Sequence, residues 1–176
     1  MCTRCGQEIT DEIPLTDHTY GEWKTETAAT DVASGTRVTT CLVCGETKSE
    51  SYSLTAEEKE AYFKQACKSM TFNELSRNPD NYAGEYVKFT GEVIQVLQEK
   101  AGSTIRYDLR VDITKTRYGY TDTIYVTYTG PTSEDRILED DIITIYGVVK
   151  GEYTYETIFG SKVTLPLVNA KYITIT

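Results

Sequence analysis

Four cysteines in the first quarter of the chain have the residue type and the spacing that bind a metal ion. They form two C-x-x-C-G motifs, CTRCG at residues 2–6 and CLVCG at residues 41–45. Two thiolates at this spacing can bind one ion from a tight turn, and the glycine that follows allows the backbone conformation that the turn requires. Two such turns complete a tetrahedral four-sulfur site, which favours zinc. The sequence therefore predicts a structural Zn²⁺ held by Cys2, Cys5, Cys41 and Cys44.

The two motifs belong to a longer repeat, CTRCGQEITDEIPLT at residues 2–16 and CLVCGETKSESYSLT at residues 41–55. The stretch between them is longer than the roughly 15–20 residues usual between such pairs. A longer loop costs little extra entropy, so the spacing does not exclude one shared site. His18, the only histidine, is an alternative ligand in place of one cysteine. If the chain is exported, disulfide bonds are the alternative state of the cysteines.

Residues 1–52 contain few large apolar side chains, with Trp23 and Tyr20 as isolated aromatic residues. Such a segment cannot bury enough apolar surface to fold without a staple. We therefore expect a small zinc-ribbon-like domain over residues 1–52. The full length of 176 residues suits such a domain joined to a medium-sized one.

Residues 53–84 predict a helical linker that packs on the following domain. Thr55 and Glu58 fit a capping box at the start of a helix over residues 55–70. Thr71 and Glu74 repeat the capping pattern at a second short turn, which an Asn-Pro-Asp sequence ends.

From residue 85 onward the hydrophobic pattern changes to a period of two, which indicates β-strands. Five strands are expected, at residues 86–99, 104–113, 121–128, 141–151 and 163–175, with a helical or turn connection at 133–140. We expect Gly91 to mark a bulge or a sharp bend in the first strand. This order is that of an OB-fold, so the predicted fold is mainly β, with a five-stranded OB barrel over residues 85–176. Another small barrel or a sandwich is the alternative.

Two stretches resemble known bacterial families. FNELSRNPDNYAGEYVKFTGEVIQV, RILEDDIITIYGVVKG and VTLPLVNAKYITI resemble bacterial OB-fold proteins grouped with the tRNA-anticodon-binding-like barrels, over residues 70–176. Most members lack an assigned activity, so this resemblance implies a binding module rather than a reaction. The stretch HTYGEWKTETAATDVASGTRVTTCLVCGETKSE is similar to a repeat of bacterial surface proteins, with Asp31 at the position of the repeat's middle cysteine. That resemblance implies a spacer or adhesion context outside the cell.

OB barrels bind ligands on the face of their second and third strands and in the flanking loops. Here that region carries basic and aromatic residues that suit single-stranded nucleic acid, because bases stack on rings while cations contact phosphates. The candidates are Arg106, Arg110, Lys115, Arg117, Tyr118, Tyr120 and Tyr125, joined by Tyr153 and Tyr155 near the last hairpin. Asp108, Asp112 and Asp122 oppose them. Pairing between side chains on a solvated face explains the Arg/Asp alternation more simply.

The remaining patterns favour a non-catalytic protein. No phosphate-binding loop is present, and Glu139, Asp140 and Asp141 are typical of an acidic turn. The net charge of −9 disfavours general binding to nucleic acid or to anionic membranes. We expect protein or peptide interaction through the barrel, with single-stranded nucleic-acid binding and a cell-surface structural role as alternatives.

No apolar run has the length of a transmembrane helix, and no signal peptide is visible, so we expect no membrane insertion. The expected location is cytoplasmic if Met1 is the native start. It is extracellular or at the cell surface if the chain is a fragment of an exported protein.

Overall fold

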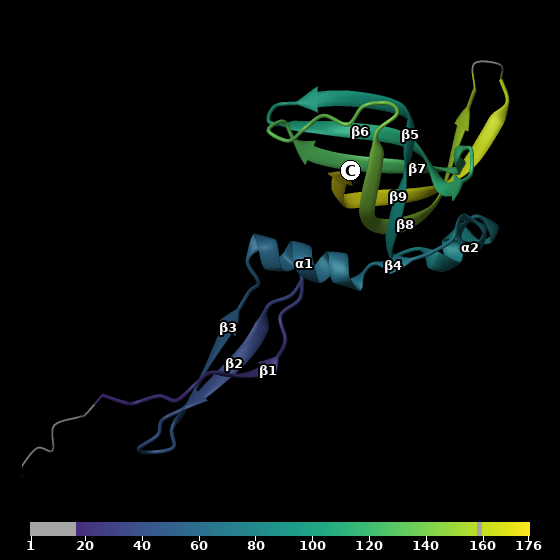
Figure 1. Ribbon diagram of the computed structural model, residues 1–176. Coiled ribbons are helices and arrows are strands. Elements are labelled where there is room, and N and C mark those ends of the chain that lie inside the picture. The colour runs from purple at the N-terminus through teal and green to yellow at the C-terminus, as the bar shows by residue number, and fades with distance from the viewer. Residues whose placement is uncertain (1–16, 158–159) are drawn as a thin grey trace, which may run out of the picture. The chain divides into compact units, whose positions relative to one another are not determined.

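The computed structural model describes residues 17–157 and 160–176, and the chain divides into two compact units, Met1–Leu54 and Thr55–Thr176 (Figure 1). Cys2 and Cys5, half of the predicted zinc site, lie outside the described residues. The helical segment that follows residue 54 belongs to the second unit.

The first unit contains a three-stranded antiparallel sheet in the order β1-β2-β3. Its strands are β1 (Lys24–Thr27), β2 (Gly35–Thr40) and β3 (Thr47–Tyr52). Arg37 lies at its centre, with its guanidinium carbon 5.0 Å from the ring centroid of Trp23 and 5.6 Å from that of Tyr52. Its Nε also donates to Glu50 at 2.7 Å. Few apolar side chains are buried here among the described residues. Polar and cation–π contacts therefore supply much of the stability of this sheet.

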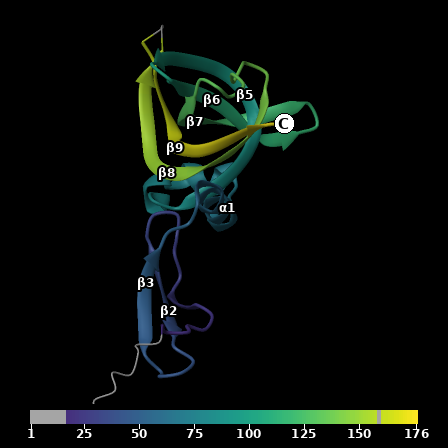
Figure 2. The same ribbon diagram turned by 90° about the vertical axis from the view of Figure 1, so that its left-hand side faces the viewer.

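The second unit is built on five long strands that form a barrel-like sheet (Figure 2). They are β5 (Tyr86–Ala101), β6 (Thr104–Thr116), β7 (Gly119–Pro131), β8 (Ile142–Glu156) and β9 (Lys162–Ile175). Their order is β5-β6-β7-β9-β8, and β8 also pairs with β5. β7 and β9 are parallel and pair over a short stretch only, at Tyr125–Thr127, so the barrel is partly open there. The predicted mainly β, barrel-like architecture is confirmed in this form.

β5 is the strand that serves both sides of the barrel. Its first half, from Tyr86 to Glu92, pairs with β8, and the rest of the strand pairs with β6. The bulge that we expected at Gly91 lies instead between Val93 and Gln95, where the register with β6 shifts. Gly91 has a different role, because a Cβ atom there would collide with the backbone carbonyl of Asp112.

Two helices precede the barrel, α1 (Ala56–Ala66) and α2 (Phe72–Arg77), and both predicted capping boxes are present. The Thr55 hydroxyl accepts from the Glu58 N–H at 3.2 Å, and Glu58 accepts from the Thr55 N–H at 2.8 Å. α1 ends earlier than the predicted residue 70, because Lys68–Ser69 forms the short strand β4, which pairs in parallel with β5.

A short 3₁₀ helix, η1 (Pro79–Tyr82), leads into β5. Between β7 and β8, residues 132–141 form turns, and no helix is present in this connection. None of the helices in the described ranges has the length and apolar character needed to cross a membrane.

Phe63 connects α1 to the outside of the barrel. It is 1% exposed, and its ring centroid lies 4.7 Å from that of Tyr86 and 5.8 Å from that of Tyr172. The Nζ atom of Lys171 lies 4.7 Å from the Phe63 ring centroid. This one aromatic side chain therefore contacts both β5 and β9.

Replacing Phe63 by alanine should lower the free energy of unfolding of the barrel unit by about 3–5 kcal/mol, because it leaves a cavity under α1. The neighbouring Tyr62 is 41% exposed, so Tyr62→Ala serves as the control and should cost less than about 1 kcal/mol. Urea unfolding followed by circular dichroism measures both. Equal losses for the two variants would contradict this packing.

Candidate functional site

The described part of the first unit brings together one histidine and two cysteines. The possible ligand atoms of His18, Cys41 and Cys44 all lie within 4.8 Å of one another. His18 Nδ1 is 3.3 Å from the Cys44 sulfur. His18 Nε2 lies 3.1 Å from the Glu46 carboxylate. Two sulfurs and one imidazole nitrogen form a donor set that fits zinc.

The local fold explains why these side chains meet. Tyr20 forms an antiparallel bridge with Cys41, and the Leu42 N–H donates to Thr19 at 2.8 Å, which places the segment of His18 beside the Cys-x-x-Cys turn. The turn is closed by the Gly45 N–H, which donates to the Cys41 carbonyl at 3.0 Å. Gly45 adopts a φ of 76°, so glycine suits this position.

The electrostatics of the turn favour a thiolate. Hydrogen bonds from the backbone N–H groups of Cys44 and Val43, and then from His18, lower the pKa of the Cys41 thiol to about 6. Hydrogen bonding to Cys41 and the charge of Glu46 raise the pKa of His18. The thiolate is the form of cysteine that binds metals, so these hydrogen bonds favour the metal-binding form of Cys41. Neither Cys41 nor Cys44 forms a disulfide within the described residues.

The structure thus places half of the predicted zinc ligands together and adds His18, which the sequence offered only as an alternative. Asp31 is buried but is not a member of this cluster. Glu46 was not predicted. Its position next to the glycine of the second C-x-x-C-G motif is the only sequence signal that could have pointed to it.

A second candidate site lies on the outer surface of β6 and β7. Tyr125 on β7 stacks on Tyr153 of β8, with ring centroids 4.1 Å apart and planes 29° apart. Tyr153 in turn lies 6.2 Å from Tyr155. The Arg110 Nη1 atom donates to the Tyr155 hydroxyl at 2.8 Å. We call these four residues, Arg110, Tyr125, Tyr153 and Tyr155, the tyrosine face.

Backbone pairing assembles the tyrosine face. Arg110 and Tyr125 are directly opposite each other on β6 and β7. Leu167 of β9 pairs with Tyr125 on one side and with Gly151 of β8 on the other. Gly151 has a φ of 93° at a register shift in β8, and beyond it the β8–β9 hairpin extends past the barrel. Tyr153, two residues further on, therefore lies beside Tyr125.

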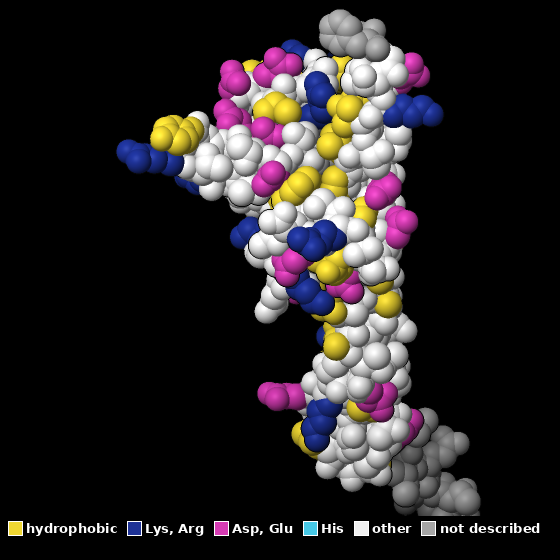
Figure 3. Space-filling model, turned by 90° about the vertical axis from the view of Figure 1, so that its right-hand side faces the viewer, with side chains coloured by type: hydrophobic (Ala, Val, Ile, Leu, Met, Phe, Trp, Pro, Cys, Tyr) yellow, Lys and Arg dark blue, Asp and Glu magenta, His cyan; other side chains and the backbone are white. Residues whose placement is uncertain are grey.

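The acidic groups around the tyrosine face already contact neighbouring side chains. Asp108 lies 3.6 Å from Arg106, and Asp112 accepts a hydrogen bond from Thr123 at 2.5 Å. The Arg110 Nε atom is buried and has no hydrogen-bond partner among the described residues. The face drawn in Figure 3 shows basic side chains interspersed with acidic and hydrophobic ones.

Burial raises the pKa of Tyr125 well above its usual value, and hydrogen bonding to Tyr153 and the negative charge of Asp108 raise it further. Tyr125 is therefore a neutral phenol at all physiological pH values. As a neutral ring, it is suited to stacking and to donating a hydrogen bond.

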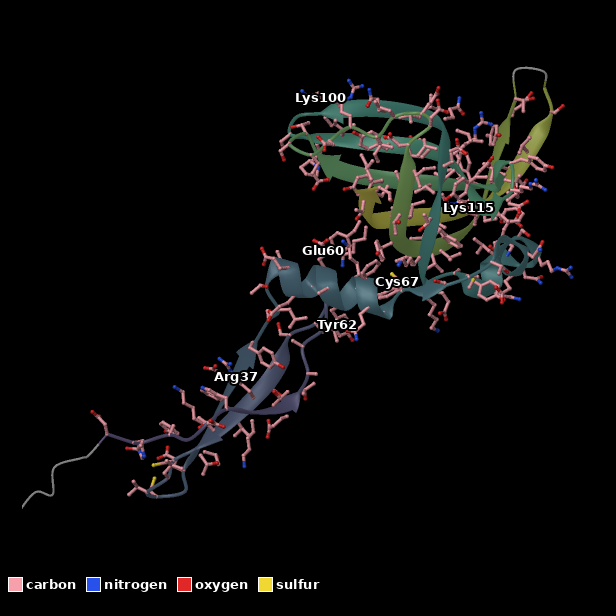
Figure 4. The ribbon with its side chains drawn as sticks, in the orientation of Figure 1. Arg37, Glu60, Tyr62, Cys67, Lys100 and Lys115 are labelled. Carbon is pink, nitrogen blue, oxygen red and sulfur yellow. The ribbon has the colours of Figure 1, made fainter. Side chains whose placement is uncertain are left out.

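The other predicted ligand residues do not all join this surface. Lys115 and Tyr120 are opposite each other near the end of the β6–β7 hairpin (Figure 4). Lys115 shares its side of β6 with Ile113, and both line a hollow of about 370 Å³ beside Met70 and Thr71. It therefore lies on the other side of the hairpin from Arg110.

Arg117 and Tyr118 occupy the tip of the β6–β7 hairpin, where Tyr118 is 93% exposed. Arg106 lies on the same side of β6 as Arg110, opposite Thr129 of β7. The nine predicted residues thus divide into a compact group of four and five outlying residues.

The acidic residues at the start of β8 serve a turn. The Asp141 carboxylate accepts a hydrogen bond from the Leu138 N–H at 2.8 Å, and Asp140 has a φ of 70°. Both observations fit the acidic turn that the sequence indicated.

No family model matches this sequence, and no curated protein matches it. Among solved structures, a mitochondrial single-stranded DNA-binding protein from S. cerevisiae, Rim1, is similar over 52% of this chain and 94% of that chain. The two are 14% identical, with a TM-score of 0.32. Similarity at this level does not identify the function of this chain.

The effect of the Asp108 charge on Tyr125 can be tested by titration. In Asp108→Asn the negative charge that disfavours the phenolate is removed, so the pKa of Tyr125 should fall relative to the native protein. Site-specific ¹³C NMR of the tyrosine ring measures it. Asp122→Asn, on the same hairpin, is the charge-matched control and should leave Tyr125 unchanged. A pKa of Tyr125 that does not fall in Asp108→Asn would show that the Asp108 charge does not disfavour the phenolate.

Proposed function

We propose that the barrel unit is a non-catalytic binding module and that its tyrosine face binds single-stranded nucleic acid. The observation that carries this proposal is the stack of Tyr125 on Tyr153, with Tyr155 and Arg110 beside it. Every nucleobase has a π-face, so stacked aromatic rings beside a cation bind single strands with little sequence preference. Tyr153 is 37% exposed and offers ring surface to such a base.

The acidic composition limits the strength of this interaction. With a net charge of −9, long-range attraction to phosphates is weak, and stacking must supply most of the affinity. We therefore expect only about two phosphate contacts, from Arg110 and Arg106, and a salt dependence with a log–log slope of about −1.4. A shallow slope together with a large effect of the tyrosines distinguishes this mode from general electrostatic binding.

Tyr125→Ala and Tyr153→Ala should each weaken binding of a short fluorescent single-stranded oligonucleotide by about 5- to 100-fold, because each removes a stacking partner. Fluorescence anisotropy at low salt measures the dissociation constants. Tyr62→Ala, an exposed tyrosine on α1, is the control and should bind as the native protein does. If no oligonucleotide binds, or if all three variants bind equally, the proposal is wrong.

Protein or peptide interaction is the second candidate, and the mixed charges on the barrel surface favour it. Acidic and basic groups side by side suit a partner with its own mixed charge better than a polyanion. In that case the tyrosines would act as anchor residues for a partner. Mutation of the tyrosine face would then abolish capture of the partner while oligonucleotides failed to bind the native protein.

For the first unit we propose a structural Zn²⁺ held by Cys41, Cys44 and His18, with the fourth ligand supplied by Cys2 or Cys5. The support is the meeting of three donors in the described part, together with Glu46 on the far nitrogen of the imidazole. A carboxylate in that position leaves Nδ1 facing the sulfurs. Such an ion would stabilise a sheet that buries few apolar groups.

The purified protein should contain about one zinc per chain by elemental analysis. Cys41→Ser and Cys44→Ser should lose it, and Glu46→Gln should weaken zinc binding by about 10- to 100-fold, because Glu46 orients His18. Glu26→Gln, an exposed acid of the same unit, is the control.

Single Cys2→Ser and Cys5→Ser variants separate the two ligand sets. If His18 is a ligand, no more than one of these two changes should abolish stoichiometric binding, and His18→Gln should weaken it. Loss in both cysteine variants with a silent His18→Gln would instead show a four-cysteine site.

A further inference from the structure

Two adjoining hollows lie between the β5–β6 hairpin and the connection of residues 132–141. The connection is held to the hairpin at both ends. The Thr132 N–H donates to the Ser103 carbonyl at 2.9 Å, and at the other end the Asp140 N–H donates to the Val93 carbonyl at 2.8 Å. Between these points Ile137 is buried in the barrel core, at 3% exposure. Hydrogen bonds at both ends of the connection therefore hold it against the hairpin, with the hollows between them.

The first hollow has a volume of about 370 Å³, and its polar lining comes from both segments. It is lined by Gln98, Lys100, Ile105, Thr132 and Arg136. The second has a volume of about 280 Å³ and shares Gln98 and Arg136 with the first. Its other lining residues are Val96, Ile137, Leu138 and Glu139. Together they form one groove, with Lys100 and Arg136 at a cationic end and Val96, Ile137, Leu138 and Glu139 at the other end, and we call it the cationic groove.

The charges at the cationic end are not neutralised by the described part of the protein. The side chains of Lys100 and Arg136 form no ion pair and no hydrogen bond with other described residues. Of the nearby carboxylates, Glu134 accepts a hydrogen bond from the Tyr128 hydroxyl at 3.2 Å, and Glu139 lines the second hollow and not the first. Asp135 lines a separate hollow with Tyr128. In a chain with a net charge of −9, a hollow whose charged lining is two cations is a local exception.

We propose that the cationic groove binds a small phosphate monoester, with the phosphate between Lys100 and Arg136 and the organic group toward Val96 and Leu138. A phosphate monoester carries about −1.5 to −2 charges at pH 7 and three acceptor oxygens, so it can use both cations at once. Arginine offers a planar pair of donors and lysine a compact charge, and the Thr132 hydroxyl and Gln98 amide can complete the shell. A carboxylate, with one charge and two oxygens, would leave one cation unused.

This site is independent of the tyrosine face. Figure 4 shows Lys100 at the end of the β5–β6 hairpin, remote from Lys115 at the end of the β6–β7 hairpin. The lining residues Gln98 and Lys100 pair with Tyr107 and Ile105, which are buried in the core. They therefore lie on the inner side of β5 and β6, whereas Arg110 and Tyr125 face outward.

Isothermal titration calorimetry on the full chain with inorganic phosphate, phenyl phosphate and benzoate tests the proposal. Phenyl phosphate should bind saturably at concentrations below about 10 mM and about tenfold more tightly than inorganic phosphate, because its ring enters the end lined by Val96 and Leu138. Benzoate should bind at least about tenfold more weakly than phenyl phosphate, since it lacks the second charge. No saturable binding of phenyl phosphate, or equal binding of benzoate, would overturn the proposal.

Variants separate the two ends of the groove. Lys100→Gln with Arg136→Gln should weaken both phosphate ligands by about tenfold or more. Lys150→Gln with Lys162→Gln changes the net charge equally at exposed positions outside the groove, and should leave binding unchanged. Leu138→Asn should remove the advantage of phenyl phosphate over inorganic phosphate without weakening the latter. Equal losses in the two double variants would show unspecific charge attraction and overturn the proposal.

Discussion

The architecture of the second unit depends on the pairing of β5 with two different strands. Its first half pairs with β8 and the rest with β6, and the register shift between Val93 and Gln95 lies where the strand changes partner. A strand that serves both sides of a sheet must bend, and this bend makes the five strands barrel-like. Beyond the bend, β5 and β6 continue as a hairpin that extends away from β8, and the connection between β7 and β8 lies against its inner side.

The two candidate binding surfaces of this unit lie where a hairpin extends beyond the strands that pair with it in the barrel. The β8–β9 hairpin extends past Gly151 and brings Tyr153 and Tyr155 to Tyr125. The β5–β6 hairpin extends past Val93 and forms one wall of the cationic groove. The tyrosine face is aromatic, and its acidic residues contact neighbouring side chains. The cationic groove is defined by two cations whose side chains have no ion-pair partner in the described part of the chain. These differences in chemistry are the reason for assigning them different ligands.

Local sequence patterns predicted the parts of the structure that depend on neighbouring residues. Thr55 and Thr71 begin helices as their capping boxes indicated, and the period of two located all five long strands. Features that depend on distant pairing were not predicted. α1 ends early because Lys68–Ser69 pairs with β5, and no local pattern shows this contact.

The candidate sites follow the same division. The C-x-x-C-G spacing pointed to Cys41 and Cys44, and composition pointed to the tyrosines and Arg110. The position of His18 beside the cysteines depends on the bridge between Tyr20 and Cys41, which a sequence pattern does not show. Similarly, the sequence analysis grouped Lys115 with Arg110 on one surface, but the alternation of side chains along β6 places Lys115 on the opposite side.

The most direct test of the central claim is an NMR titration of the native protein with a short single-stranded oligonucleotide, followed by chemical-shift changes of the backbone and tyrosine rings. The account predicts that the changes concentrate at Arg110, Tyr125, Tyr153 and Tyr155 and saturate with one strand per chain. Changes confined to other surfaces, or none at low salt, would contradict it.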